Sequence, residues 1–187
     1  MKKALLLAGV ASLFATAANA EIKPYIGLDG NYSTLDWAYD FENAVEDDYQ
    51  SVSLIAGAKV VRNFGLEAFY QLSGGEKNYG KSYITDDNFY HSRFTAYGLD
   101  ALGYLPLGCE GKVELIAGAG VGEYTFKVRQ LGLGSAKDHS TGYRLNAGVQ
   151  YNIDENWSLR GMYHHVYTQK SEVDAIDEFS VGIRYNF

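Results

Sequence analysis

The chain has 187 residues, a net charge of -7 at pH 7, 21 Gly, 16 Tyr and a single Cys. This is the length of one domain, and one Cys excludes an internal disulfide framework or a multi-thiolate metal site. The acidic pI of about 5.0 argues against a nucleic-acid-binding protein, and 47% hydrophobic residues argue against disorder. With a mean hydropathy of -0.21, the remaining classes are a soluble β or α+β domain and a membrane β-barrel.

The N-terminal residues have the three parts of an export signal. Lysines at positions 2 and 3 precede an apolar stretch over residues 4–15, and Ala18-Asn19-Ala20 matches a cleavage site. We therefore predict that residues 1–20 are a cleaved signal peptide and that residues 21–187 form one exported domain.

Eight segments of the exported domain alternate between apolar and polar residues, which is the period of a strand with two different faces. In the first segment, Ile26 and Leu28 share one face, while Asp29 and Asn31 share the other. The eight segments are residues 22–32, 51–61, 64–73, 93–105, 113–122, 142–152, 157–167 and 179–187.

The connections between these segments alternate in length. The short ones are residues 62–63, 106–111 and 153–156, and the long ones are 33–50, 74–92, 123–141 and 168–178. Short periplasmic turns and long extracellular loops are typical of outer-membrane barrels. We therefore predict an all-β fold, an eight-stranded antiparallel transmembrane β-barrel with up-and-down topology and both termini in the periplasm.

Strand length and aromatic positions agree with a membrane-spanning barrel. Ten residues at about 3.3 Å each, tilted by about 40°, cover roughly 25 Å, the height of the apolar band of such a barrel. The strands must close on themselves, because hydrocarbon leaves no partner for an open edge. We expect aromatic side chains at two levels: Phe64, Tyr151, Trp157 and Phe187 near the turns, and Tyr32, Tyr70, Tyr143, Tyr167 and Phe179 near the loops.

The polar faces contain charges of both signs at membrane depth. Four acids and four bases can compensate one another, and an eight-stranded barrel is only wide enough for side chains to fill it. We predict an interior salt-bridge network, with inward glycines leaving room for the Arg side chains; a narrow ion pore is the alternative. The predicted network residues are Asp29, Lys59, Glu67, Asp100, Glu114, Arg144, Arg160 and Arg184.

Two stretches resemble a known family. The closing segment, residues 179–187 with Gly182, Tyr185 and Phe187, is similar to the β-signal by which outer-membrane proteins are recognised by the barrel-assembly machinery. Residues 96–106 resemble the fourth strand and turn of the small outer-membrane β-barrel family, which includes opacity-type and outer membrane protein A-like barrels. The resemblance implies a barrel in the outer membrane of a Gram-negative bacterium. It implies little about activity, because the family includes adhesins and structural barrels.

The long loops contain the candidate binding residues. The first loop has six acidic residues between positions 36 and 48, which could bind divalent cations that bridge lipopolysaccharide, or a basic partner. It lacks the spacing and turn glycine of a calcium loop, so we predict a solvated acidic loop and no metal site. Loop aromatics are the kind of anchor that binding surfaces use, although they could also pack on one another. The candidates are Trp37, Tyr39, Phe41, Tyr79, Tyr83, Phe89 and Tyr90.

An enzyme is the main alternative class. Lipid A deacylases are small barrels with a His, a Ser two residues later and an acid about a dozen residues further on. Here His164-His165 and Asp177 lie in the corresponding region, but Val166 and Tyr167 occupy the positions where Ser is needed. We therefore predict no catalytic residue and no cofactor, and expect Cys109, in a short turn, to be a free thiol.

The sequence thus predicts a non-catalytic outer-membrane barrel that presents four extracellular loops for adhesion or envelope interaction. The expected partners are outer-membrane lipid and lipopolysaccharide, the barrel-assembly machinery and an extracellular or host ligand, but no nucleic acid. We expect a monomer. A deacylase-like enzyme and a narrow ion pore are the alternatives.

Overall fold

The computed structural model describes residues 22–37, 48–74, 76–79, 89–108, 111–130, 134–169 and 173–187. This part of the chain contains no helix that is long and apolar enough to cross a membrane. The strands are β1 (Lys23–Trp37), β2 (Asp48–Val61), β3 (Phe64–Ser73), β4 (Glu76–Tyr79), β5 (Phe89–Leu107), β6 (Val113–Gln130), β7 (Gly134–Asn152), β8 (Trp157–Gln169) and β9 (Val173–Asn186).

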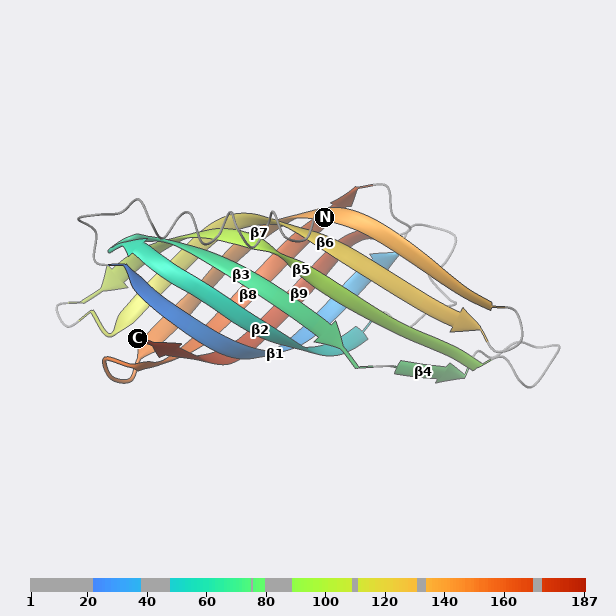
Figure 1. Cartoon of the computed structure of the whole chain (residues 1–187), viewed down its shortest axis with the longest axis horizontal. Coiled ribbons are helices and arrows are strands. Elements are labelled where there is room, and N and C mark those ends of the chain that lie inside the picture. The colour runs from blue at the N-terminus through green and yellow to red at the C-terminus, as the bar shows by residue number, and fades with distance from the viewer. Residues whose placement is uncertain are drawn as a thin grey trace.

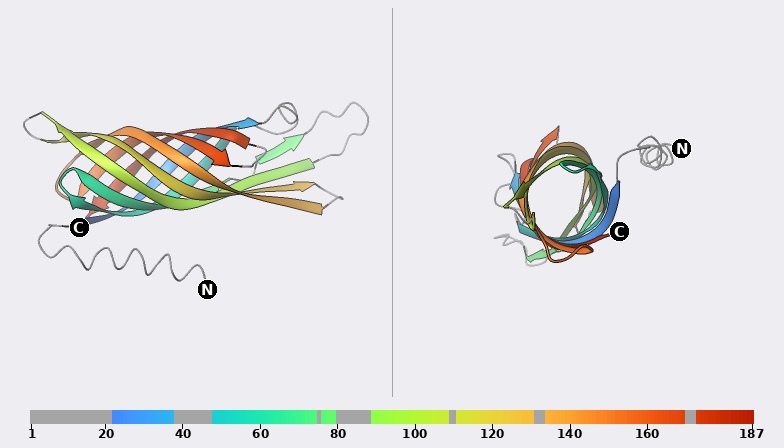
Figure 2. Two further views of the ribbon diagram at one scale, coloured as in Figure 1. Left: turned by 90° about the horizontal axis from the view of Figure 1, so that it is seen from above. Right: turned by 90° about the vertical axis from the view of Figure 1, so that its left-hand side faces the viewer.

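Eight of these strands form a closed antiparallel barrel (Figure 1). Each wall strand pairs with the next one along the chain; β1 also pairs with β9, and β3 pairs directly with β5. Viewed along its axis, the wall forms a ring (Figure 2). The predicted eight-stranded up-and-down fold is therefore confirmed. The short strand β4 adds to the edge of β5 beyond the wall.

The two ends of the barrel differ. At one end, here called the turn end, β1 begins, β9 ends and residues 153–156 connect β7 to β8. The opposite end, the loop end, is where β6 and β7 extend furthest. The prediction of a long loop at 123–141 was wrong, because Gln130 pairs with Gly134 and only residues 131–133 separate the strands. The prediction of a long loop at 168–178 was wrong as well, because β8 ends at Gln169 and β9 begins at Val173. An antiparallel ladder needs only backbone hydrogen bonds, so it continues after the apolar alternation stops.

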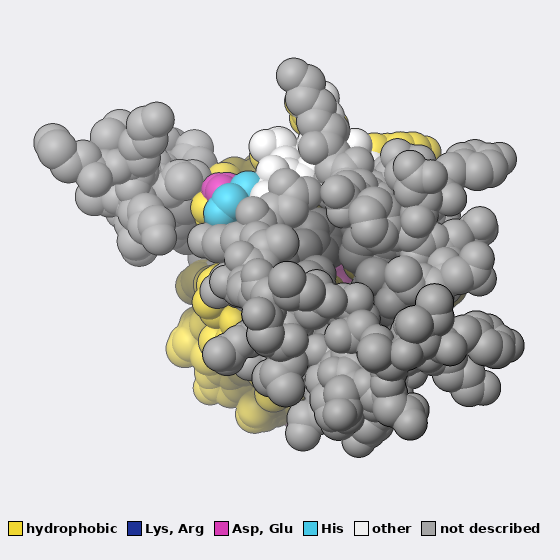
Figure 3. Space-filling view, turned by 90° about the vertical axis from the view of Figure 1, so that its right-hand side faces the viewer, with side chains coloured by type: hydrophobic (Ala, Val, Ile, Leu, Met, Phe, Trp, Pro, Cys, Tyr) yellow, Lys and Arg dark blue, Asp and Glu magenta, His cyan; other side chains and the backbone are white. Residues whose placement is uncertain are grey.

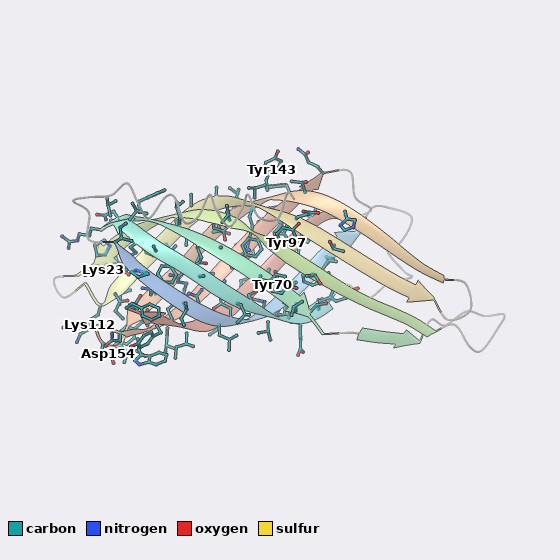
Figure 4. The ribbon with its side chains drawn as sticks, viewed as in Figure 1. Lys23, Tyr70, Tyr97, Lys112, Tyr143 and Asp154 are labelled. Atoms are coloured by element: carbon teal, nitrogen blue, oxygen red, sulfur yellow. The ribbon has the colours of Figure 1, made fainter. Side chains whose placement is uncertain are left out.

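Side chains alternate between the barrel interior and the outside, as the sequence indicates. Leu28 is 49% exposed, whereas its neighbour Asp29 is 5% exposed. Outward aromatics occur towards both ends; Tyr70, Tyr97 and Tyr143 lie towards the loop end in Figure 4, and Lys23 lies at the turn end. The nine aromatic residues expected at the two levels all belong to the exposed large hydrophobic residues.

Candidate functional site

A polar network fills the barrel from the turn end inwards. Nζ of Lys59 lies 2.8 and 2.6 Å from the two carboxylate oxygens of Glu114, which also accepts from the amide of Gln150 at 3.1 Å. The Gln150 carbonyl accepts from Arg160 at 3.0 and 2.8 Å, and Nη1 of Arg160 lies 2.5 Å from Oε2 of Glu67. A continuous chain of polar contacts therefore connects Lys59 with Glu67 across the interior.

A second ion pair joins the first and last strands. Arg184 on β9 binds Asp29 on β1 through two contacts, one of them Nη2 to Oδ2 at 2.8 Å. A Cβ atom on Gly182 would overlap the Asp29 carboxylate, and one on Gly27 would overlap the Arg184 side chain. These inward glycines therefore make the space that the ion pair occupies.

The third group lies around Arg144. Its guanidinium nitrogens are 3.7 Å from Asp100 and 3.4 Å from Glu178, and it stacks over the ring of Phe69 at 4.1 Å. Glu178 also accepts from the Ser33 hydroxyl at 2.8 Å. The sequence prediction does not include Glu178, because its last alternating segment begins at Phe179. Extending the alternation by one residue places Glu178 in the interior.

Apolar side chains enclose the network towards the loop end. Tyr49 and Phe94 meet edge to face, with ring centroids 5.7 Å apart. These two rings belong to a cluster of inward apolar side chains, each at most 3% exposed, that we call the apolar layer. Its members are Leu35, Tyr49, Phe94, Ala96, Tyr124, Val166 and Ile176. The sequence prediction assigned only polar residues and glycines to the interior and so missed this layer.

The two adjacent histidines of β8 point to opposite faces. His164 is buried inside the barrel, with Nδ1 2.7 Å from Oδ1 of Asn146 and Nε2 3.2 Å from Oγ of Ser180. Asn146, His164 and Ser180 thus have the arrangement of orienting group, base and nucleophile in a hydrolase. All three side chains are, however, buried inside the barrel. His165 faces outward, and its Nδ1 lies 2.6 Å from Oδ1 of Asp177.

Outward tyrosines near the loop end bind carboxylates on neighbouring strands. The Tyr163 hydroxyl donates to Oδ1 of Asp177 at 2.5 Å, and Tyr97 donates to Glu123. The ring of Tyr167, two residues after His165, packs edge to face on the imidazole with centroids 4.4 Å apart. Figure 3 looks onto the loop end and shows acidic and histidine side chains together at the rim beside a hydrophobic flank.

The predicted loop residues are only partly described. Tyr79 in β4 pairs with Phe89 in β5, Tyr90 is in β5, and Trp37 is the last residue of β1. Predictions for Tyr39, Phe41, Tyr83, Cys109 and the signal peptide lie outside the described residues. Across the part of the chain that is described, no three His, Cys, Asp or Glu side chains gather as metal ligands.

The proposed assembly signal lies at the turn end of β9. Tyr185 packs between Trp157 and Phe187, with ring centroids 5.0 and 5.1 Å away. Gly182 faces inward beside Asp29. The three residues are therefore divided between the outer aromatic level and the interior.

The family model of the outer membrane protein beta-barrel domain matches residues 4–187. The chain belongs to this family. It is a small barrel of the bacterial outer membrane, and the family resemblance noted in its sequence is confirmed. No curated protein matches the chain in sequence.

Solved structures of other outer-membrane barrels have the same fold. Neisserial surface protein A has a TM-score of 0.63 at 18% identity, covering 89% of this chain and 97% of that one. The attachment invasion locus protein Ail of Yersinia pestis has a TM-score of 0.57 at 16% identity, with the same coverage. A major outer membrane protein from Thermus thermophilus has a TM-score of 0.60 at 12% identity, covering 89% and 99%.

Proposed function

We propose that this outer-membrane barrel is a non-catalytic scaffold that presents its loop end outside the cell for adhesion or envelope interaction. The observation that carries the proposal is the contrast between the two parts of the molecule. The interior is filled by ion pairs and the apolar layer, whereas β5, β6 and β7 continue as paired strands beyond the outward aromatics. A rigid scaffold with projecting hairpins suits recognition of a macromolecular ligand.

The names of the similar barrels support this direction. One is called a surface protein and another an attachment invasion locus protein, crystallised also with a heparin analogue. We infer for this chain an export signal cleaved after Ala20, assembly through Gly182, Tyr185 and Phe187 by the barrel-assembly machinery, and a monomer surrounded by lipid and lipopolysaccharide.

The test removes the projecting hairpin while keeping the wall. Joining Tyr124 to Ser140, which pair across β6 and β7, through a two-residue Asn-Gly turn deletes only the extension. Attachment of bacteria to immobilised host matrix and epithelial cells should fall, while the barrel remains folded. Unchanged attachment after this deletion and after replacement of residues 80–88 by Gly-Ser would contradict the proposal.

A lipid A deacylase is the second candidate, because His165 and Asp177 form a base and orienting pair on the outer surface. The chemistry also needs a nucleophile beside the base, and Tyr167 packs on the imidazole at the position where the deacylase motif has Ser. Mass spectra of lipid A from cells with the wild-type chain and with His165→Ala decide between the two. An acyl chain lost only with the wild type would establish the enzyme.

A further inference from the structure

The outer surface formed by β8, β9, β1 and β2 is layered in rows set by the strand register. His165 pairs with Asp177, Asp177 with Thr34, and Thr34 with Asp48. These four residues, here called the polar row, all face outward near the loop end. They cross four adjacent strands, so they form one continuous strip at the level where lipid headgroups meet the barrel.

Two different rows lie beneath the polar row. The first is aromatic, with Tyr163, Phe179 and Tyr32 side by side. Below it, Val181 pairs with Gly161 on one side and with Gly30 on the other. Val181 is 71% exposed, the highest value among the large hydrophobic residues, because it stands between two positions without side chains.

The two glycines are not required by packing within the barrel. A Cβ atom on Gly161 would meet nothing within 4 Å, and one on Gly30 would meet only the Val181 carbonyl at 3.9 Å. Glycine weakens a strand, and one in a strand interior often marks a place where a ligand approaches closely. Here the glycines leave a furrow on each side of Val181, directed from the aromatic row towards the middle of the membrane.

The polar row has atoms directed towards a ligand. The Tyr163 hydroxyl and the His165 Nδ1 both contact Oδ1 of Asp177, so Oδ2 of that carboxylate and Nε2 of the imidazole remain for an external group. Asp48 accepts from Thr34 at 3.1 Å. Two carboxylates therefore lie on the strip, and the described outward side chains of these four strands at this level include no Lys or Arg.

We propose that this surface is a binding site for one membrane lipid with a primary-amine headgroup. The ammonium donates to Asp177, whose carboxylate Tyr163 and His165 hold in position, and an acyl chain lies in the furrow over Gly161. Charge complementarity selects the amine, because a headgroup that offers only a phosphate would face the carboxylates of Asp177 and Asp48, with no Lys or Arg among the described outward side chains at this level. The furrow adds van der Waals contact that a uniform aliphatic wall would not offer.

Native mass spectrometry of the intact folded barrel tests the site. The barrel in detergent is titrated with phosphatidylethanolamine, phosphatidylcholine or phosphatidylglycerol of identical acyl chains. A charge-assisted hydrogen bond corresponds to about tenfold or more in affinity, so we expect one ethanolamine lipid to bind about ten times more tightly than either other lipid. Asp177→Asn should remove this preference, and Gly161→Leu should weaken binding by filling the furrow.

Gly103→Leu is the matched control. Gly103 faces outward on β5, and a Cβ atom there would make only ordinary contacts, the nearest at 3.5 Å. Each variant is used only if it keeps the heat-dependent gel mobility of a folded barrel, and His165→Asn replaces Asp177→Asn if that variant fails to fold. Equal affinity for the three lipids, an equal loss in Gly103→Leu, or tighter phosphatidylglycerol binding with Mg²⁺ would each overturn the proposal.

Discussion

Removing one partner of the Arg160–Glu67 ion pair should strongly destabilise the barrel. The atoms lie 2.5 Å apart, and the two side chains are 1% and 7% exposed, so neither charge reaches solvent. Breaking such a pair typically costs about 3–5 kcal/mol, because the remaining charge stays buried without compensation. Arg160 keeps its contacts to Gln150, so we expect Glu67→Gln to lose about 3 kcal/mol and Glu67→Leu about 5 kcal/mol of unfolding free energy.

The measurement is reversible urea unfolding in lipid vesicles, followed by tryptophan fluorescence. The double variant Glu67→Leu with Arg160→Met removes both charges together, so it should lose about 1 kcal/mol or less, far below the sum of the single losses. Tyr25 and Tyr104, which contact the pair, still have each other at 3.1 Å. A Glu67→Leu loss below about 1 kcal/mol, or additive losses in the double variant, would refute the reasoning.

Three further outcomes follow from the structure. Gly182→Ala should lower the free energy of unfolding by about 1–3 kcal/mol, because the new methyl group overlaps Asp29. Gly161→Ala should change it by less than about 0.5 kcal/mol, because its methyl group meets open space. The same urea titration measures both variants, and equal effects would contradict the packing argument. The wild-type barrel should show no steady conductance in planar bilayers, and Phe94→Ala with Tyr124→Ala should raise it by opening the apolar layer; a conducting wild type would show that the interior is not sealed. Tyr185→Ala with Phe187→Ala should lower the folded fraction in cells at least several-fold while refolding in detergent continues; equal loss in both settings would indicate a stability defect instead of a lost assembly signal.

The wall of the barrel could be predicted because each strand spans two different environments. Leu28 alternates with Asp29, and Leu145 with Arg144, because one face of each strand meets lipid and the other faces the barrel interior. The extension of β6 and β7 could not be predicted in this way, since both faces of a strand beyond the membrane meet more similar surroundings. There the ladder depends on backbone pairing alone, which leaves no period in the sequence.

The sequence also does not predict which of the interior charges form ion pairs with each other. Inward charges could be identified one strand at a time, but Asp29 meets Arg184, 155 residues away, only because the barrel closes through β1 and β9. Likewise, Lys59 reaches Glu114 across the interior and not on a neighbouring strand. The sequence analysis treats the adjacent His164 and His165 as one candidate catalytic position, although neighbouring side chains of a strand point to opposite faces.

The interior charges also protect the alignment of the strands during assembly. Each of the eight wall strands contributes at least one of them: Asp29, Lys59, Glu67, Asp100, Glu114, Arg144, Arg160 and Arg184. Sliding any strand by one residue would turn its charge out into the hydrocarbon and turn its aliphatic side chains inward. For Arg or Lys at the bilayer midplane this costs about 2–4 kcal/mol, and the abandoned partner adds a further penalty. The ion pairs that fill the barrel therefore also make a closure that is misaligned by one residue less stable than the correct one.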